Sequence, residues 1–141
     1  MLKIIILALL FSAPVAAKDL NKNIIQDYGR YTLKGRLLDG DVSNPGKKTS
    51  LIKNGDGYSG LLLDATLDIR PLINHLDADS LQSYSALKDG TLQHLQIDMT
   101  NKQRKFYNEN YGKHVSVLCN IEFIGRYFTP VYCEVISFDK K

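Results

Sequence analysis

The sequence lacks the motifs by which the common enzyme classes are recognised. It contains no Gly-x-Ser-x-Gly turn, no His-Glu-x-x-His pair and no glycine-rich phosphate loop ending in Lys-Ser or Lys-Thr. Its three histidines, His75, His94 and His114, have no second histidine or cysteine at the spacing typical of metal ligands. We expect no metal site, no other cofactor and no catalytic residue from these patterns.

The chain also carries little net charge. The chain has 18 lysines and arginines against 15 aspartates and glutamates, a formal net charge of +3. So small an excess gives no general attraction for nucleic acid. Lys102, Arg104 and Lys105 lie close together in sequence, and we interpret them as the solvated face of a helix. No nucleic-acid partner is expected.

Long apolar runs are absent except near the first residue. Residues 4–11 are continuously apolar, follow Lys3, and are separated by a proline from the small residues that end at Ala17. This pattern is typical of a secretory signal peptide cleaved after Ala17. The alternative, a transmembrane anchor, needs about 20 apolar residues. We expect residues 1–17 to be a signal peptide and residues 18–141 to be one soluble domain in the periplasm, or secreted beyond it.

Alternating apolar and polar residues predict several β-strands. The first strand covers residues 31–37, and Gly35 within it indicates a bulge or a sharp bend. Further strands are predicted over residues 58–69 and 95–99. Between them, residues 72–90 permit short helical turns and end in an Asp-Gly turn.

One helix is predicted clearly, over residues 100–112. Thr100 and Gln103 have the spacing of a capping box, in which each side chain bonds the backbone N–H of the other residue. Gly112 stands where a helix would end. This helix separates the third predicted strand from the last two.

Cysteine is also rare, and the two cysteines lie on the last two predicted strands. In an exported chain Cys119 and Cys133 pair most simply with each other, and two buried free thiols are the alternative. A hairpin centred on Arg126 places Cys119 directly opposite Cys133, Val117 opposite Val135 and Ile121 opposite Val131. This register predicts a disulfide across the hairpin.

The resulting order is three strands, a helix and two strands. This is the order of the oligonucleotide/oligosaccharide-binding (OB) barrel, a mostly β fold with five strands and a helix between strands 3 and 4. A generic α+β meander is the alternative. We predict an OB-like barrel.

Several short segments near the last two strands resemble domain-of-unknown-function family 4431, which consists of small, mostly exported bacterial proteins. They are Tyr111–Val117, with the pattern Gly-Lys-x-Val-x-Val, then Phe123, Gly125 and Thr129-Pro130-Val131. The resemblance implies a fold and an exported location, and it implies no activity. Arg126-Tyr127-Phe128 stands where the family has histidines, so no role of those histidines carries over.

The predicted hairpin turn carries unusual residues for a turn. Arg126, Tyr127 and Phe128 belong to the residue types that dominate binding hot spots. In an OB barrel this turn and the loop between the first two strands, here with Lys47 and Lys48, border the usual ligand face. We predict a partner site there. The alternative is that Tyr127 and Phe128 fold back over an open barrel end.

Together these features favour a non-enzymatic binding module of the bacterial envelope, with a protein partner favoured over a glycan. One version is an immunity protein that blocks a toxin delivered into the periplasm. A hydrolase built on Asp64, Asp68 and His94 is the first alternative, and it requires these side chains to converge in one pocket. A structural envelope component is the second. Alternation predicts that His94 and His114 are solvent-exposed on their strands.

Overall fold

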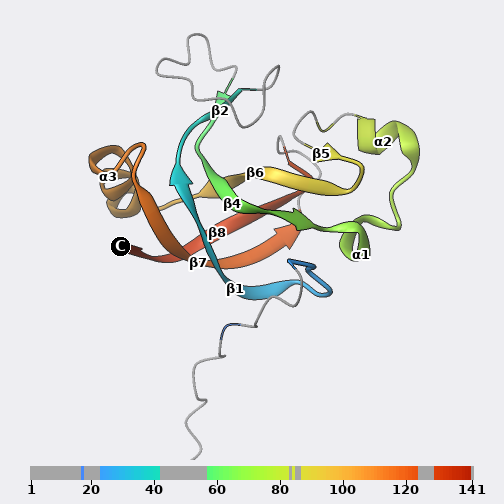
Figure 1. Cartoon of the computed structure of the whole chain (residues 1–141), viewed down its shortest axis with the longest axis horizontal. Helices are drawn as coiled ribbons and strands as arrows, with labels where there is room; N and C mark the ends of the chain where they lie inside the picture. Colours follow the sequence, from blue (N-terminus) through green and yellow to red (C-terminus); the bar gives the residue numbers. More distant parts are fainter. Residues whose placement is uncertain are drawn as a thin grey trace, which may run out of the picture.

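We describe a computed structural model of the chain, which covers Ala17 and residues 23–41, 57–82, 84, 87–123 and 129–140. Figure 1 labels most of its helices and strands. In chain order they are β1 (Gly29–Leu37), β2 (Gly40–Asp41), β3 (Gly57–Tyr58), β4 (Gly60–Asp68), α1 (Arg70–Ile73), α2 (Ala78–Gln82), β5 (Leu87–Lys88), β6 (Thr91–Asp98), α3 (Asn101–Glu109), β7 (His114–Phe123) and β8 (Val131–Lys140). None of these helices is long and apolar enough to cross a membrane.

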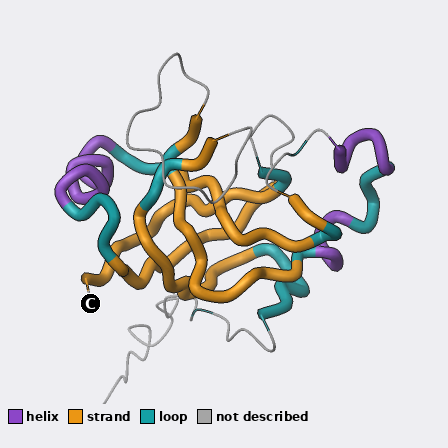
Figure 2. Tube along the Cα trace, turned by 45° about the horizontal axis from the view of Figure 1, so that its top comes forward, coloured by secondary structure: helices purple, strands orange, loops and turns teal. Residues whose placement is uncertain are grey.

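Five long strands close into a barrel. Their order is β4-β1-β7-β8-β6, and β4 also pairs with β6, so the sheet returns to its first strand. All of these pairs are antiparallel except β6 with β8, which is parallel. Figure 2 shows the strands wrapped around a common centre, with α3 at one side. The predicted OB-like barrel, mostly β with a helix between its third and fourth strands, is confirmed.

The barrel interior is filled by the apolar residues of the alternating strands. Along β1 the buried and exposed positions alternate from Tyr31 to Leu37, as the sequence predicted. Leu33, Leu61 and Val117 are among the buried residues of one continuous core. Since side chains of successive strand residues point to opposite faces, this pattern leaves polar residues on the outer surface of β1.

Strand β1 has a paired strand on each side at Gly35, and neither register shifts there, so the predicted bulge is absent. Gly35 pairs with Val115 of β7 on one side and with Leu63 of β4 on the other. A Cβ at this position would overlap the backbone carbonyl of Leu62. The absence of a side chain at Gly35 therefore permits the close approach of β1 to β4.

The segment that follows β4, where the sequence permitted short helical turns, contains two short helices and a tight turn. In α1, Leu72 and Ile73 are buried. Asp89 and Gly90 both have positive φ angles between the paired residues Lys88 and Thr91. Two successive residues with positive φ are typical of a type I′ turn, for which Asp-Gly is a favoured sequence.

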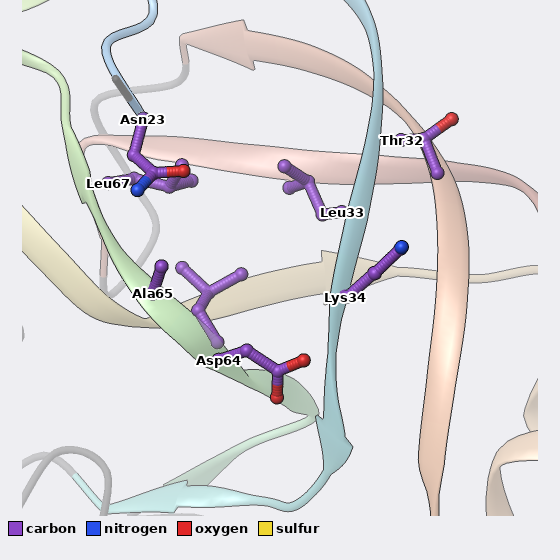
Figure 3. A pocket seen from close by; sticks show the side chains of 8 residues that line it. Asn23, Thr32, Leu33, Lys34, Asp64, Ala65 and Leu67 are labelled. Carbon is purple, nitrogen blue, oxygen red and sulfur yellow. The ribbon is translucent and has the colours of Figure 1, made fainter. Parts of the chain in front are cut away.

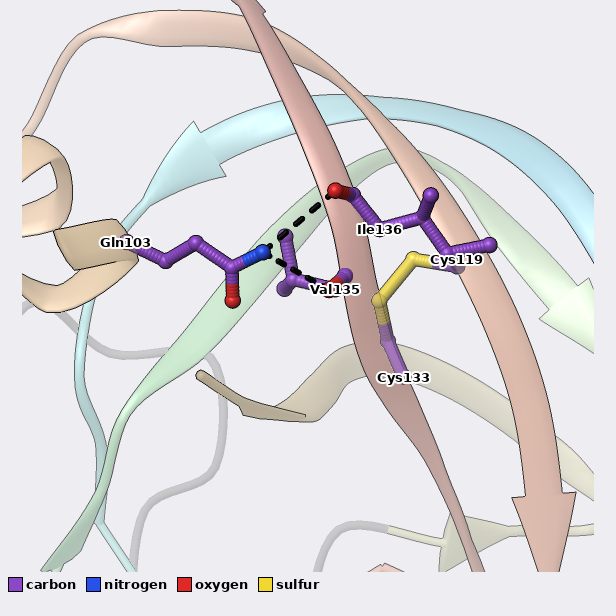
Figure 4. The surroundings of a disulfide bond; sticks show 5 residues. All are labelled: Gln103, Cys119, Cys133, Val135 and Ile136. Atoms are coloured by element: carbon purple, nitrogen blue, oxygen red, sulfur yellow. Dashed lines mark hydrogen bonds between the residues drawn. A yellow bond between two sulfur atoms is a disulfide. The ribbon is translucent and has the colours of Figure 1, made fainter. Parts of the chain in front are cut away.

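The predicted capping box of α3 is present, and Gln103 has a second role. Its side chain accepts a hydrogen bond from the Thr100 backbone N–H, while the Thr100 hydroxyl accepts one from the Gln103 N–H. The Gln103 amide also donates to the backbone carbonyls of Val135 and Ile136, at 2.9 and 3.4 Å (Figure 4). The register of β7 with β8 shifts between Leu118 and Cys119, next to these carbonyls. Gln103 thus binds the start of the helix to an irregular part of β8.

The predicted disulfide between Cys119 and Cys133 is confirmed, with their Cα atoms 5.0 Å apart (Figure 4). The predicted register was wrong by two residues from Cys119 to Phe123 and by three before the register shift. Cys119 lies opposite Val135, and Ile121 lies opposite Cys133. A shift of two residues keeps every side chain on its original face, so the apolar pattern fits either register equally well. The two cysteines are diagonal neighbours on the inner face and still approach closely enough to bond.

The predicted partners of the two valines change accordingly. Val117 lies opposite Phe138 instead of Val135, and Val131 lies opposite Phe123 instead of Ile121. Between these two pairs the register includes the shift beside Cys119. Alternation in sequence does not reveal such an irregularity, because the helix side chain that contacts it comes from another part of the chain.

We expect Gln103→Glu to lower the free energy of unfolding by about 1–2 kcal/mol, because it retains the acceptor of the capping box but removes the two bonds to β8 carbonyls. Urea denaturation followed by circular dichroism measures this change. Asn101→Asp, at an exposed position of the same helix, adds the same single negative charge and is the matched control. Equal stability of Gln103→Glu and the control would contradict the role assigned to the amide.

Candidate binding site at the stems of two loops

The first predicted binding loop, with Lys47 and Lys48, lies between β2 and β3, and the second, with Arg126, lies between β7 and β8. A buried histidine contacts the stem of the first loop. His94 on β6 is 1% exposed. Its Nε2 lies 2.6 Å from the carbonyl oxygen of Leu38, and its Nδ1 lies 3.0 Å from the hydroxyl of Tyr58. Because a carbonyl only accepts, Nε2 carries the proton and Nδ1 accepts from Tyr58. His94 therefore connects β6 to both sides of the stem.

Two glycines give the histidine and tyrosine rings their space. A Cβ on Gly60 would overlap the His94 ring, and a Cβ on Gly40 would overlap the Tyr58 ring. The two rings meet edge to face, with centroids 5.0 Å apart. Burial lowers the pKa of His94 to about 4, so the neutral ring described above is the form present at neutral pH.

The expectation that His94 is solvent-exposed was wrong. Alternation assigns it to the face opposite Leu95, and the register places it across from Leu62. The stem residues Leu38 and Tyr58 contact its ring nitrogens there and bury it. Periodicity predicts the face of a strand, but it does not predict which other segment covers that face. The glycines on either side of the stem were the available sequence signal.

Helix α3 holds the same stem from the other side. The hydroxyl of Tyr107, a side chain 2% exposed, donates to the Asp39 carboxylate at 2.6 Å and accepts from the Gly60 N–H at 3.2 Å. Burial raises the pKa of Tyr107, and its hydrogen bond to Asp39 raises it further. The Tyr111 hydroxyl accepts from the Asp39 backbone N–H at 3.0 Å. The residues just before β2 and just after β3 are therefore fixed by a network of side-chain bonds.

One residue of β6 joins the stems of both predicted binding loops. Ile97 donates its backbone N–H to the Ser59 carbonyl at 3.0 Å. On its other side, Ile97 pairs with Cys133 of β8. Ser59 follows the first loop, and Cys133 lies just after the second and is linked to β7 by the disulfide. The residue that follows the first loop and the strand that follows the second therefore lie on the two sides of β6.

The predicted contact residues themselves lie outside the described residues. These residues are Arg126, Tyr127, Phe128, Lys47 and Lys48. The prediction that they bind a partner stays a prediction.

The residues of the hydrolase alternative have separate partners. Asp64 pairs with His114, which is partly exposed at the start of β7. Asp68 forms an ion pair with Arg70, and the Arg70 side chain lowers the pKa of the Asp68 carboxyl. His94 is buried against the loop stem. The structure therefore does not bring Asp64, Asp68 and His94 into one pocket.

No set of three or more His, Cys, Asp and Glu side chains within the described ranges is grouped so that it would hold a metal ion. His75, the third histidine, is exposed and packs against the Phe123 ring in a T-shaped arrangement, with centroids 5.5 Å apart.

A second feature is a hollow of about 200 Å³ between β1 and β4 (Figure 3). The two strands pair along Gly35–Leu37 and Leu61–Leu63, and the hollow lies beyond these pairs on the side away from the loop stem. Its lining residues are Asn23, Thr32, Leu33, Lys34, Leu63, Asp64, Ala65 and Leu67. It combines an apolar floor with a polar rim.

The fold and these contacts define a small OB-like barrel with a cross-strand disulfide and a braced loop stem. No protein-family model, curated protein or solved structure matches this chain. The resemblance to family 4431 therefore stays a prediction.

Proposed function

We propose that this protein is a non-enzymatic, exported binding module that holds a protein partner between its two predicted binding loops. The contact residues in this proposal are Arg126, Tyr127 and Phe128 of one loop and Lys47 and Lys48 of the other. The observation that carries the proposal is the shared position of Ile97, which pairs with the stems of both loops. Loops with neighbouring, rigid stems are suited to contact one partner together.

The braced stem supports a binding role on energetic grounds. Ordering a loop on binding costs free energy, and a pre-organised base lowers that cost. Here His94, Tyr107 and Tyr111 fix the residues on both sides of the first loop. An arginine and two aromatic residues in the second loop favour a protein over a glycan as the partner.

The cysteine pair supports the exported location in the proposal. Disulfides persist in oxidising compartments such as the periplasm and are rare in the cytosol. The bond between Cys119 and Cys133 joins the strands on either side of the second loop. Together with the predicted signal peptide over residues 1–17, it favours a protein that works in the envelope.

A narrower form of the proposal is an immunity protein whose partner is a toxin delivered into the periplasm. Small size, one domain and a disulfide suit such a role, as does a contact surface made of loops. The resemblance to family 4431 is compatible with it but supplies no activity.

The test is capture of the partner from an envelope extract by the oxidised protein, followed by its identification and a binding measurement with both purified proteins. We expect Arg126→Ala with Tyr127→Ala to weaken this binding at least 100-fold while the melting temperature changes by only a few degrees. Arg36→Ala with Tyr28→Ala, two exposed side chains of β1 and its approach, is the matched control. Unchanged binding by the first pair would refute the proposed surface.

The immunity version has its own measurement. The purified partner should inhibit growth when it is exported to the periplasm, and coexpression of this protein should restore growth. Restoration should fail with Arg126→Ala and Tyr127→Ala. A partner without toxicity would refute the immunity role while leaving the binding role in place.

A further inference from the structure

Strand β4 contains a bulge where it borders the hollow. Between the pair Leu62 with His94 and the pair Leu67 with Leu92, four residues of β4 lie opposite one residue of β6. The three residues that follow Leu63 in this bulge are all exposed. Bulges redirect side chains and are frequent beside functional sites. The pairing of β4 with β1 ends at Leu63, so the bulge lies where the hollow opens between the two strands.

The floor of the hollow suits one apolar side chain. Leu33, Leu63 and Leu67 belong to the buried core and line the hollow. Its volume of about 200 Å³ is below the roughly 300–1,000 Å³ of pockets for drug-sized ligands. The matching ligand is therefore small and carries a single apolar group.

The β4 side of the rim carries an oriented carboxylate. The Nε2 of His114 lies 2.5 Å from the Oδ2 of Asp64. With a neutral imidazole, Nε2 donates to this oxygen, and the pair keeps the single negative charge of the carboxylate. A carboxylate accepts several hydrogen bonds, so Asp64 can accept from an ammonium group of a ligand as well.

The β1 side of the rim carries a cation. Lys34 forms no ion pair with any described residue. The next cation along the strand, Arg36, is not part of the lining, and its guanidinium donates to the Gly112 carbonyl at 3.2 Å. Figure 3 shows Lys34 on β1 and Asp64 on β4, the two strands that border the space. The rim therefore has one charge of each sign, on facing strands.

Charges of both signs around an apolar floor match a ligand that carries both charges itself. An anion alone would leave the Asp64 carboxylate unmatched, and a cation alone would leave Lys34 unmatched. A free α-amino acid has an ammonium group, a carboxylate and its side chain on one carbon atom, so it can meet both charges and the floor at once.

We propose that the hollow between β1 and β4 binds a free α-amino acid with an apolar side chain. The ammonium group lies against Asp64, which His114 orients, the carboxylate lies against Lys34, and the side chain covers Leu33 and Leu67. This site is separate from the two loops and does not depend on the function proposed for them.

The test is a titration of the oxidised, ¹⁵N-labelled protein at pH 7 with L-leucine, with L-leucinamide, which lacks the carboxylate, and with N-acetyl-L-leucine, which lacks the ammonium group. We expect amide-resonance changes centred on residues 32–34 and 63–67. Leucine should bind about five-fold more tightly than either blocked form, the range of an exposed ion pair. Higher salt should reduce both differences.

The blocked forms also stand for the ends of a peptide, since leucinamide resembles a first residue and N-acetyl-leucine a last one. If either binds as tightly as leucine, the hollow does not require both charges and the proposal fails. It fails equally if leucine causes no resonance changes or causes them elsewhere.

Variants assign each charge of the ligand to one side chain. Lys34→Gln should weaken binding of leucine about five-fold and leave binding of leucinamide unchanged. Asp64→Asn should weaken binding of leucine about five-fold and leave binding of N-acetyl-leucine unchanged. Lys88→Gln, an exposed lysine on β5, is the control and should bind leucine as the unchanged protein does. A variant that weakens leucine and the corresponding blocked form equally would overturn the assignment of that charge.

A last variant tests the hollow itself. Ala65→Leu, at an exposed position of the lining, should fill the space and abolish binding of leucine and of both blocked forms. Unchanged binding of leucine by this variant would place the ligand elsewhere and overturn the proposal.

Discussion

Replacing both Cys119 and Cys133 by alanine is expected to lower the free energy of unfolding by at least about 3 kcal/mol. The bond closes a loop between residues 14 apart in sequence. In the chain-entropy account, a cross-link over such a loop removes entropy from the unfolded state and so raises the free energy of that state by about this much. Both residues are fully buried, so alanine also leaves unfilled volume in the core. Equilibrium denaturation in urea measures the difference.

The control for the cysteine variant is the unchanged sequence, unfolded and refolded under reducing conditions. Reduction removes the covalent bond but keeps the side-chain volume. It should reproduce most of the loss, and the remainder reports the unfilled volume. If the reduced and oxidised proteins unfold at the same urea concentration, the bond contributes nothing and the expectation fails.

The second large effect concerns pH and His94. In the unfolded chain the pKa of a histidine is near 6.5, whereas in the folded protein burial lowers the pKa of His94 to about 4. Well above pH 6.5 the ring is neutral in both states, so it does not alter the free energy of unfolding. As the pH falls from 6.5 towards 4, the unfolded chain takes up the proton first, so stability is lost across this window. The total loss is about 3 kcal/mol for a difference of this size.

The measurement is the free energy of unfolding at several pH values between 4 and 7, compared with that of His94→Gln. The variant does not titrate, so its stability should fall by about 3 kcal/mol less than that of the unchanged protein between pH 6.5 and pH 4. His75→Gln removes an exposed histidine and should leave the pH dependence as it was. Parallel curves for the unchanged protein and His94→Gln would show that His94 is not held neutral by burial.

The sequence predicted the parts of the fold that depend on local pattern. Alternation located the long strands, and the Thr100 and Gln103 pair located the start of α3. The disulfide followed from two cysteines on the same face of one hairpin. Each of these depends on residues close together in the chain, where periodicity and capping chemistry act directly.

What the sequence did not predict depends on contacts between distant segments. From Cys119 to Phe123 the hairpin register was wrong by two residues because both registers bury the same apolar side chains. His94 was expected on the surface because nothing nearby in sequence indicates that Tyr58 and Leu38 cover it. The network of Asp39 with Tyr107 and Tyr111 was missed for the same reason.

The parallel pairing of β6 with β8 has a consequence for how the chain reaches its final form. β1, near the start of the domain, must find β7, and β6 must find the last strand. Contacts between such distant residues slow folding, since chain entropy is lost before they form. The barrel therefore cannot close before β8 is present, and a chain that stops before Val131 leaves the edges of β6 and β7 open to aggregation.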